Sequence, residues 1–249
     1  MSAIAKFLAN TKEYDPPYLI DGLLPSHEIH LLAGPTGAGK TTWLFDMLRN
    51  WERGDDILGC QSHPVPWIYV AGDRSDDGMY RTMDRMRIPH DAFLTIPAWD
   101  QHMTFQQILD HVSKSGAKLA VLEGFGQYVD PPGQTKQVRD FLCSACGICK
   151  KEKITIIGVV ESPKMKPRDQ YENPRQRVSG PAAWGHHSET IFLMEPRDAS
   201  RPSDAKRMLT VCPRNAAGLE IPYVFKFGHL QREKASKNGH SSLLNPIDM

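Results

Sequence analysis

The segment from Gly34 to Thr41 carries the most specific chemical pattern in the sequence, GPTGAGKT. The apolar run 29–33 leads into it, and a helix-forming stretch leaves it. Glycines here let consecutive backbone N–H groups point at phosphate oxygens, and the positive end of the following helix strengthens that attraction. The pattern predicts a site for ATP and Mg²⁺, in which Lys40 bridges the β- and γ-phosphates and the Thr41 hydroxyl ligates the metal. The residues predicted to contact the nucleotide are Gly34, Pro35, Thr36, Gly37, Ala38, Gly39, Lys40, Thr41 and Thr42.

Two acidic residues that follow apolar runs would complete this site. A phosphate loop needs a carboxylate at the end of a neighbouring strand to hold the Mg²⁺ shell, and Glu123 follows such a run at 117–122. Asp73 follows the run 68–71, where it could orient or deprotonate the attacking water. Each has a structural alternative: Glu123 as an ordinary strand-end carboxylate, and Asp73 as a helix cap together with Ser75.

The elements that must position these residues alternate along the chain. Apolar β-rich runs lie at 29–33, 67–71, 93–96, 119–122 and 154–160, and amphipathic helical segments lie at 41–51, 78–86, 105–112 and 138–150. Strands separated by helices in this rhythm predict an α/β fold with a mostly parallel sheet covered on both faces. The runs 190–194, 207–212 and 223–227 follow with no room for helices between them, so we expect an antiparallel extension or hairpin at the C-terminal end.

Composition and charge narrow the class of protein. The chain has 249 residues, of which 40% are hydrophobic and 24% charged, as expected of a globular protein. We divide it into an extension at 1–16, one domain at 17–230 and a flexible tail at 231–249. Its 30 basic and 29 acidic residues exclude binding to nucleic acid through overall charge. No apolar stretch is long enough for a membrane span, and the odd number of cysteines makes no disulfide framework, so we expect a cytoplasmic protein without a membrane partner.

Three cysteines, Cys143, Cys146 and Cys149, have the CxxCxxC spacing of an iron–sulfur ligand run. The same spacing also fits the apolar face of a helix, together with Val138 and Leu142. Cysteine is a small residue that is readily buried, and a helix that packs on a sheet needs such a face. We therefore favour a structural interpretation of these cysteines.

The order of these motifs resembles that of RecA-like ATPases, and it is most similar to that of plasmid RepA-type single-domain hexameric helicases and their phage and mobile-element relatives. The resemblance rests on the run 18–25 (YLIDGLLP), the phosphate loop and the segment 68–75 (IYVAGDRS). It implies a RecA-like core in which Asp73 is the catalytic acid and Glu123 is the Walker B acid. It also implies that Arg214 is an arginine finger for the neighbouring subunit. The alternative is that Arg214 is an ordinary arginine on the surface of a strand. At the position where the family usually carries a His or Gln that senses the γ-phosphate, this chain has Glu161.

A basic segment at 164–177 has five basic residues against two acidic ones, and three prolines counted from Pro163, which predicts an exposed loop. The resemblance implies that this loop lies where RecA-like rings project a loop into the central channel. Tyr171 there could stack on a base. The residues predicted to contact the phosphates of single-stranded DNA are Lys164, Lys166, Arg168, Arg175 and Arg177. A solvated basic loop without a ligand is the alternative.

These features favour an oligomeric ATPase, a hexameric ring or a filament, that acts on single-stranded DNA as a helicase or translocase in replication or recombination. The alternative is a nucleotide-switched assembly or regulatory ATPase that controls a protein partner without translocation. Glu161 favours that alternative, as does Cys212, which replaces the usual lysine two residues before Arg214. The apolar end of the tail, 241–249, could dock on a protein partner or be a disordered terminus.

Overall fold

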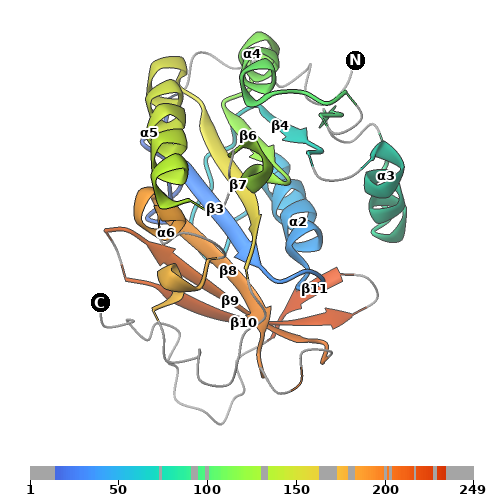
Figure 1. Ribbon diagram of the computed structural model, residues 1–249. Coiled ribbons are helices and arrows are strands. Elements are labelled where there is room, and N and C mark those ends of the chain that lie inside the picture. Colours follow the sequence, from blue (N-terminus) through green and yellow to red (C-terminus); the bar gives the residue numbers. More distant parts are fainter. Residues whose placement is uncertain are drawn as a thin grey trace.

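In the described part of the chain, nine strands form one sheet through the middle of the protein (Figure 1). In chain order they are β3 (Ile29–Gly34), β4 (Trp67–Val70), β5 (Thr95–Ile96), β6 (Leu119–Leu122), β7 (Thr155–Glu161), β8 (Thr190–Pro196), β9 (Lys206–Pro213), β10 (Leu219–Lys226) and β11 (His229–Arg232). They lie side by side in the order β11-β10-β9-β8-β3-β7-β6-β4-β5. The computed structural model describes residues 15–72, 75–90, 95–98, 101–129, 134–162, 173–178, 183–198, 201, 204–215, 217–226 and 229–233.

The strand that leads into the phosphate loop, β3, lies at the centre of this order. It pairs in parallel with β7 on one side and β8 on the other, and β6, β4 and β5 continue the parallel arrangement. Every residue of β3, β4 and β6 is buried, because helices cover both faces of a parallel sheet. The carboxyl ends of these strands meet at one edge of the sheet, where ligands bind in folds of this kind.

Helices lie on both faces of the sheet, as predicted. Two lie on one face, α2 (Lys40–Arg53) and α3 (Asp76–Arg85), and three on the other, α4 (Phe105–Ser115), α5 (Thr135–Glu152) and α6 (Ala183–His187). Trp43 and Met79 belong to the apolar core on the first face, and Phe125 and Trp184 to the core on the second. None of the described helices is both long and apolar enough to cross a membrane.

The C-terminal strands differ from the prediction in two respects. We expected the run at 190–194 to belong to an antiparallel extension, but β8 pairs in parallel with β3. A parallel neighbour needs a long crossover connection, and residues 162–189, which include α6, provide it. The strands β9 and β10 are antiparallel, as expected. The antiparallel strand β11, which pairs with β10, was not predicted. The sheet also continues past the boundary predicted at 230, because Gln231 and Arg232 pair with Val224 and Tyr223.

Two smaller features complete the comparison with the predicted elements. A short hairpin of β1 (Tyr18–Ile20) and β2 (Leu24–Pro25) precedes β3 and was not predicted. The strand predicted at 93–96 is described as β5 at its last two residues, and residues 93 and 94 lie outside the described part of the chain.

The three cysteines of the CxxCxxC run lie on α5. Cys149 is buried, Cys146 is half-buried against the same core, and Cys143 is exposed. Burial raises the pKa of the Cys149 thiol, as expected of a structural cysteine. Over the described ranges, no three side chains of His, Cys, Asp or Glu gather as a metal site. The structural interpretation therefore fits Cys146 and Cys149, whereas Cys143 contributes little to the core.

Candidate nucleotide-binding site

The phosphate loop connects β3, which ends at Gly34, to α2, which begins at Lys40. Gly37 and Gly39 have φ angles of 78° and 99°, in the left-handed region that glycine occupies without strain. Gly34 has no room for a side chain, because a Cβ there would lie 2.3 Å from the main-chain oxygen of Met194 on β8. The turn of the loop and its close fit against β8 therefore explain these glycines.

The Lys40 ammonium group lies over the first residues of the loop. Its Nζ donates hydrogen bonds to the carbonyl oxygens of Gly34, at 2.7 Å, and Pro35, at 3.2 Å. The same Gly34 oxygen accepts a hydrogen bond from the N–H of Ser162, just beyond β7, at 3.2 Å. A cation is thus held within the loop, next to a helix N-terminus, which is an arrangement that attracts phosphate.

Thr41 and Glu123 meet at the base of the loop. Thr41 Oγ1 donates a hydrogen bond to Oε1 of Glu123 at 2.5 Å, and Glu123 is fully buried. A hydroxyl that gives its proton to a carboxylate keeps its lone pairs for a metal ion. Mg²⁺ prefers oxygen ligands, and it commonly takes only one or two from the protein and the rest from water and phosphate. The donor set therefore fits Mg²⁺, for which Thr41 would be the direct ligand and Glu123 would orient the water molecules of the metal shell.

The turn after β6 fixes Glu123 against the end of β4. Gln127, in the 3-10 helix η1 (Phe125–Tyr128), donates from Nε2 to the Gly72 carbonyl at 2.5 Å. A Cβ on Gly72 would lie 2.2 Å from the main-chain oxygen of Glu123, so only glycine fits this contact. The two strand ends are therefore locked together at the site. Asp73, which follows Gly72 and is the predicted catalytic acid, lies outside the described residues.

Glu161 lies beside the phosphate loop. It ends β7 and pairs with Gly34 in the strand register. Its Oε1 accepts a hydrogen bond from Thr36 Oγ1 at 2.6 Å, and its side chain is exposed. Glu161 thus contacts the loop directly, where it would place negative charge close to a bound triphosphate.

Arg207, near the start of β9, is a site residue that the motif analysis did not identify. It is buried, and its Nε donates a hydrogen bond to the Ala38 carbonyl in the phosphate loop at 3.2 Å. It shares one face of β9 with Leu209 and Val211, which are core residues on the α2 side of the sheet. The alternation of Arg207 with the apolar residues Leu209 and Val211 was the sequence signal that could have identified it as a buried arginine.

Arg214, the predicted arginine finger, lies at the opposite end of the sheet from the phosphate loop. Its N–H donates to the Glu189 carbonyl, just before β8, at 2.8 Å. Its guanidinium donates to the carbonyl of His186 and lies 3.6 Å from the Glu189 carboxylate. The strand Ile29–Gly34 separates the two ends by about 17 Å, at about 3.3 Å per residue. An arginine side chain cannot span that length, so Arg214 cannot contact its own phosphate loop.

The basic segment predicted to contact DNA is described only in part. Lys164, Lys166 and Arg168 lie outside the described residues. Contrary to the expectation of an exposed loop, Arg177 forms a buried ion pair with Glu195 at 3.0 Å. Arg175 is half-buried and donates to four main-chain carbonyls at 2.8–3.1 Å, those of Gly185, Ser188, Glu189 and Cys212. Both guanidinium groups are thus engaged inside the protein.

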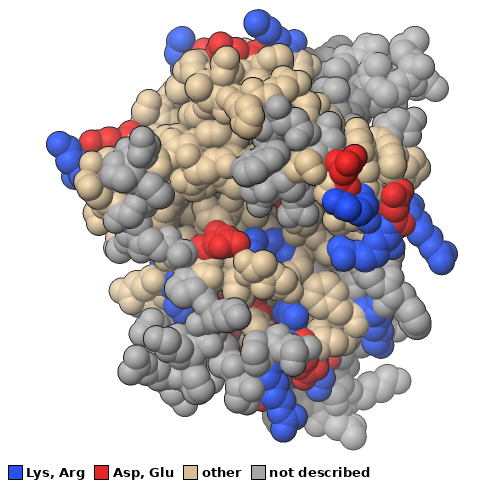
Figure 2. All heavy atoms as spheres, turned by 45° about the vertical axis from the view of Figure 1, so that its right-hand side comes forward, with Lys and Arg blue, Asp and Glu red and all other residues tan. Residues whose placement is uncertain are grey.

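The surface charge of the described residues is mixed on the face that Figure 2 shows. Lys and Arg side chains lie next to Asp and Glu there, and they do not form one continuous basic surface. This pattern agrees with the nearly balanced numbers of basic and acidic residues in the sequence. The described part of this face therefore offers no extended track for a nucleic acid backbone.

Comparisons with known proteins agree with this geometry. A family model described as an AAA domain matches residues 4–123, which include the phosphate loop and Glu123 and make up slightly less than half of the chain. No curated protein matches the sequence. The structure is similar to the crystal structure of a KaiC-like protein from the hyperthermophilic archaeon Pyrococcus horikoshii, with a TM-score of 0.59 and 16% identity over 87% of this chain and 94% of that one. Together with the strand order and the phosphate loop, this similarity shows that the chain has the RecA-like P-loop fold.

Proposed function

We propose that this protein binds ATP with Mg²⁺ at the phosphate loop and hydrolyses it. The observation that carries the proposal is the hydrogen bond between Thr41 and the buried Glu123 at the base of the loop. Thr41 would offer its hydroxyl oxygen to the metal, and Glu123 would orient the metal-bound water. Lys40, already within the loop, would move from the Gly34 and Pro35 carbonyls to the β- and γ-phosphate oxygens.

Hydrolysis needs a group that takes a proton from the attacking water. Asp73 follows the strand end that Gln127 holds next to Glu123, and we assign this role to it. Water would attack the γ-phosphorus, its proton would pass to Asp73, and the bond from the γ-phosphorus to the β,γ-bridging oxygen would break. When bound, Mg²⁺ neutralises part of the charge that develops on the phosphate oxygens. The products are ADP and inorganic phosphate.

We further propose that the protein works as a head-to-tail oligomer, a hexameric ring or a filament. Arg214 supports this, because it lies at the end of the sheet opposite its own phosphate loop and could serve only a neighbouring subunit. For that role its guanidinium would leave the His186 carbonyl and the Glu189 carboxylate. An arginine supplied in this way stabilises the charge of the transition state, so that hydrolysis depends on assembly.

Single-stranded DNA is the proposed substrate of this motor, as the resemblance to RepA-type helicases implies. Lys164, Lys166 and Arg168 are the proposed phosphate contacts. We leave Arg175 and Arg177 out of this set, because both make internal contacts that DNA binding would have to break.

A nucleotide-switched regulatory ATPase is a second candidate, and the contact of Glu161 with the phosphate loop favours it. An anion hydrogen-bonded to Thr36 opposes the approach of a γ-phosphate more than that of a diphosphate. Such a site would turn over slowly and would report the nucleotide state to a protein partner.

The steady-state rate of ATP hydrolysis, measured with and without single-stranded DNA, separates these candidates. Lys40→Ala serves as the blank because it lacks the ammonium that contacts the phosphates. Several-fold stimulation by an oligothymidine, and none by nucleosides, would support the motor. A measurable rate that is indifferent to DNA would exclude the motor and favour the switch. No rate above the blank would contradict hydrolysis itself.

A further inference from the structure

We propose that Arg207 is a positioning residue of the phosphate loop, which holds the Ala38 carbonyl and thereby aims the N–H of Gly39 at the nucleotide phosphates. The inference rests on the proposed binding of nucleotide at this loop. It assigns a function in that site to the antiparallel part of the sheet, which carries none of the phosphate-binding motifs.

The guanidinium of Arg207 is held by two parts of the chain besides the phosphate loop. Its Nη1 donates to the carbonyl oxygens of Asp204 and, at 2.9 Å, of Lys206. Its central carbon lies 5.2 Å from the centre of the Phe225 ring on β10, within the range of a cation–π contact. These contacts leave Nε directed at the Ala38 carbonyl, 3.2 Å away. The side chain is therefore held in place before it meets the loop.

The contact with Ala38 also orients the next amide. In a planar trans peptide the C=O and N–H groups point in opposite directions. When the Ala38 oxygen points at Arg207, the N–H of Gly39 must point away from β9, toward the side of the loop that receives phosphate. Gly39 has a φ of 99° and begins the turn into α2, and because it is glycine the peptide between Ala38 and Gly39 could rotate at little cost. A rotated peptide would present a carbonyl oxygen to the phosphates, which is repulsive, and Arg207 opposes this rotation.

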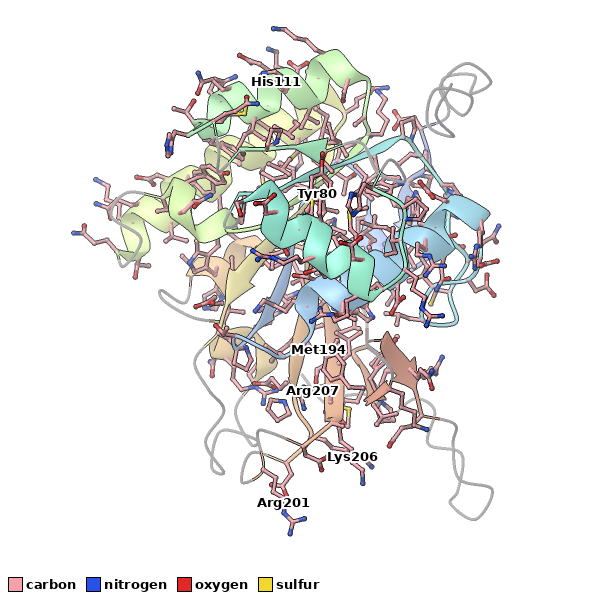
Figure 3. The ribbon with its side chains drawn as sticks, turned by 90° about the vertical axis from the view of Figure 1, so that its right-hand side faces the viewer. Tyr80, His111, Met194, Arg201, Lys206 and Arg207 are labelled. Atoms are coloured by element: carbon pink, nitrogen blue, oxygen red, sulfur yellow. The ribbon has the colours of Figure 1, made fainter. Side chains whose placement is uncertain are left out.

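The burial of Arg207 indicates that its contact with the phosphate loop has a function. It lies on the face of β9 that Leu209 and Val211 use for the core, where an arginine is costly unless its donors are satisfied. Lys206, the preceding residue, is exposed. Figure 3 shows Lys206 toward the periphery and Arg207 on the side of Met194. The main chain of Met194, on β8, lies close against Gly34 of the phosphate loop. The phosphate loop is thus supported by β8 and β9 together.

The test is the affinity for MgADP, measured by isothermal titration calorimetry on the full chain. Arg207→Gln should weaken binding at least tenfold, because the Ala38–Gly39 peptide loses its anchor. Arg207→Lys keeps a charged donor and should give an intermediate loss; it also serves as the measurement if the glutamine variant does not fold. Lys206→Gln, the matched control, removes the same charge from the neighbouring exposed position and should bind within twofold of the wild type.

A second control separates positioning from general destabilisation. Trp51→Phe removes the hydrogen bond from the Trp51 indole to the Val65 carbonyl, at 3.3 Å, in the same core but near the end of α2 that is farthest from the loop. We expect it to lower the melting temperature without changing the affinity for MgADP. An Arg207→Gln variant with wild-type affinity, or a Trp51→Phe variant with the same loss of affinity, would overturn the role of Arg207 alone. A wild-type protein that does not bind MgADP would overturn the proposed function as well.

Discussion

A buried histidine on the strand that leads to the phosphate loop should make the stability of the fold depend on pH. His30 lies on β3 and is fully buried. Its Nε2 donates a hydrogen bond to the Pro25 carbonyl at 2.9 Å, and its Nδ1 has no hydrogen-bond partner among the described residues. Burial disfavours the charged imidazolium more than the bond to Pro25 favours it, and it lowers the pKa of His30 to about 4.

The size of the effect follows from the difference between the folded and unfolded pKa. An unfolded chain binds the proton near pH 6.5, whereas the folded protein does so only near pH 4. As the pH falls, the unfolded state is therefore protonated first, and stability is lost between these two values. The full difference corresponds to about 3 kcal/mol, of which roughly 2 kcal/mol is lost between pH 7 and pH 5.

His30→Gln isolates this contribution, because a glutamine amide can still donate to the Pro25 carbonyl but does not titrate. The free energy of unfolding in urea, measured at pH 7 and pH 5, should fall by about 2 kcal/mol more for the wild type than for the variant. Equal slopes of the urea transitions would show that both proteins unfold to the same extent. Equal losses of stability in the two proteins would refute the assignment of a neutral, buried His30.

Three other substitutions test the parts of the proposed ATPase site. Thr41→Ala removes the metal ligand, so hydrolysis should fall at least ~100-fold while nucleotide binding in EDTA is retained, and Thr41→Ser should restore the rate. Glu161→Gln can keep the contact with Thr36 but removes the charge, so it should tighten ATP binding several-fold relative to ADP; an unchanged ratio would contradict the repulsion. Arg214→Ala should lower turnover by about 10³-fold at unchanged ATP affinity, and mixing with Lys40→Ala subunits should restore part of it if the arginine acts between subunits.

The sequence predicts the site best where local pattern decides the structure. Apolar runs flanked by helical segments predict β3 and β6, because a parallel sheet buries both faces of its strands. The motif spacing then brings Thr41 and Glu123 to the same edge, and the structure joins them by a hydrogen bond. Residues 82 positions apart could be related in this way because each is fixed to the end of a parallel strand.

Contacts made by side chains across the sheet could not be predicted. Arg207 reaches Ala38 only because β9 lies next to β8 in the sheet. The residue pattern within β8 or β9 does not predict which strands are neighbours. Arg175 belongs to a segment that reads as a basic loop, yet it binds four carbonyls of α6, β9 and the turn before β8. For Arg175 the basic segment suggested an exposed position, and Arg207 was not identified at all. Long-range hydrogen bonds determine where both side chains lie.

The most direct test of the ATP site is the binding of ATP to the wild type, Lys40→Ala and Lys206→Gln, each with Mg²⁺ and with EDTA. The site predicts that the wild type and Lys206→Gln bind with similar affinity in Mg²⁺, that EDTA weakens both, and that Lys40→Ala binds at least tenfold more weakly. Binding that is absent from the wild type, or that Lys40→Ala retains in full, would contradict a nucleotide site at the phosphate loop.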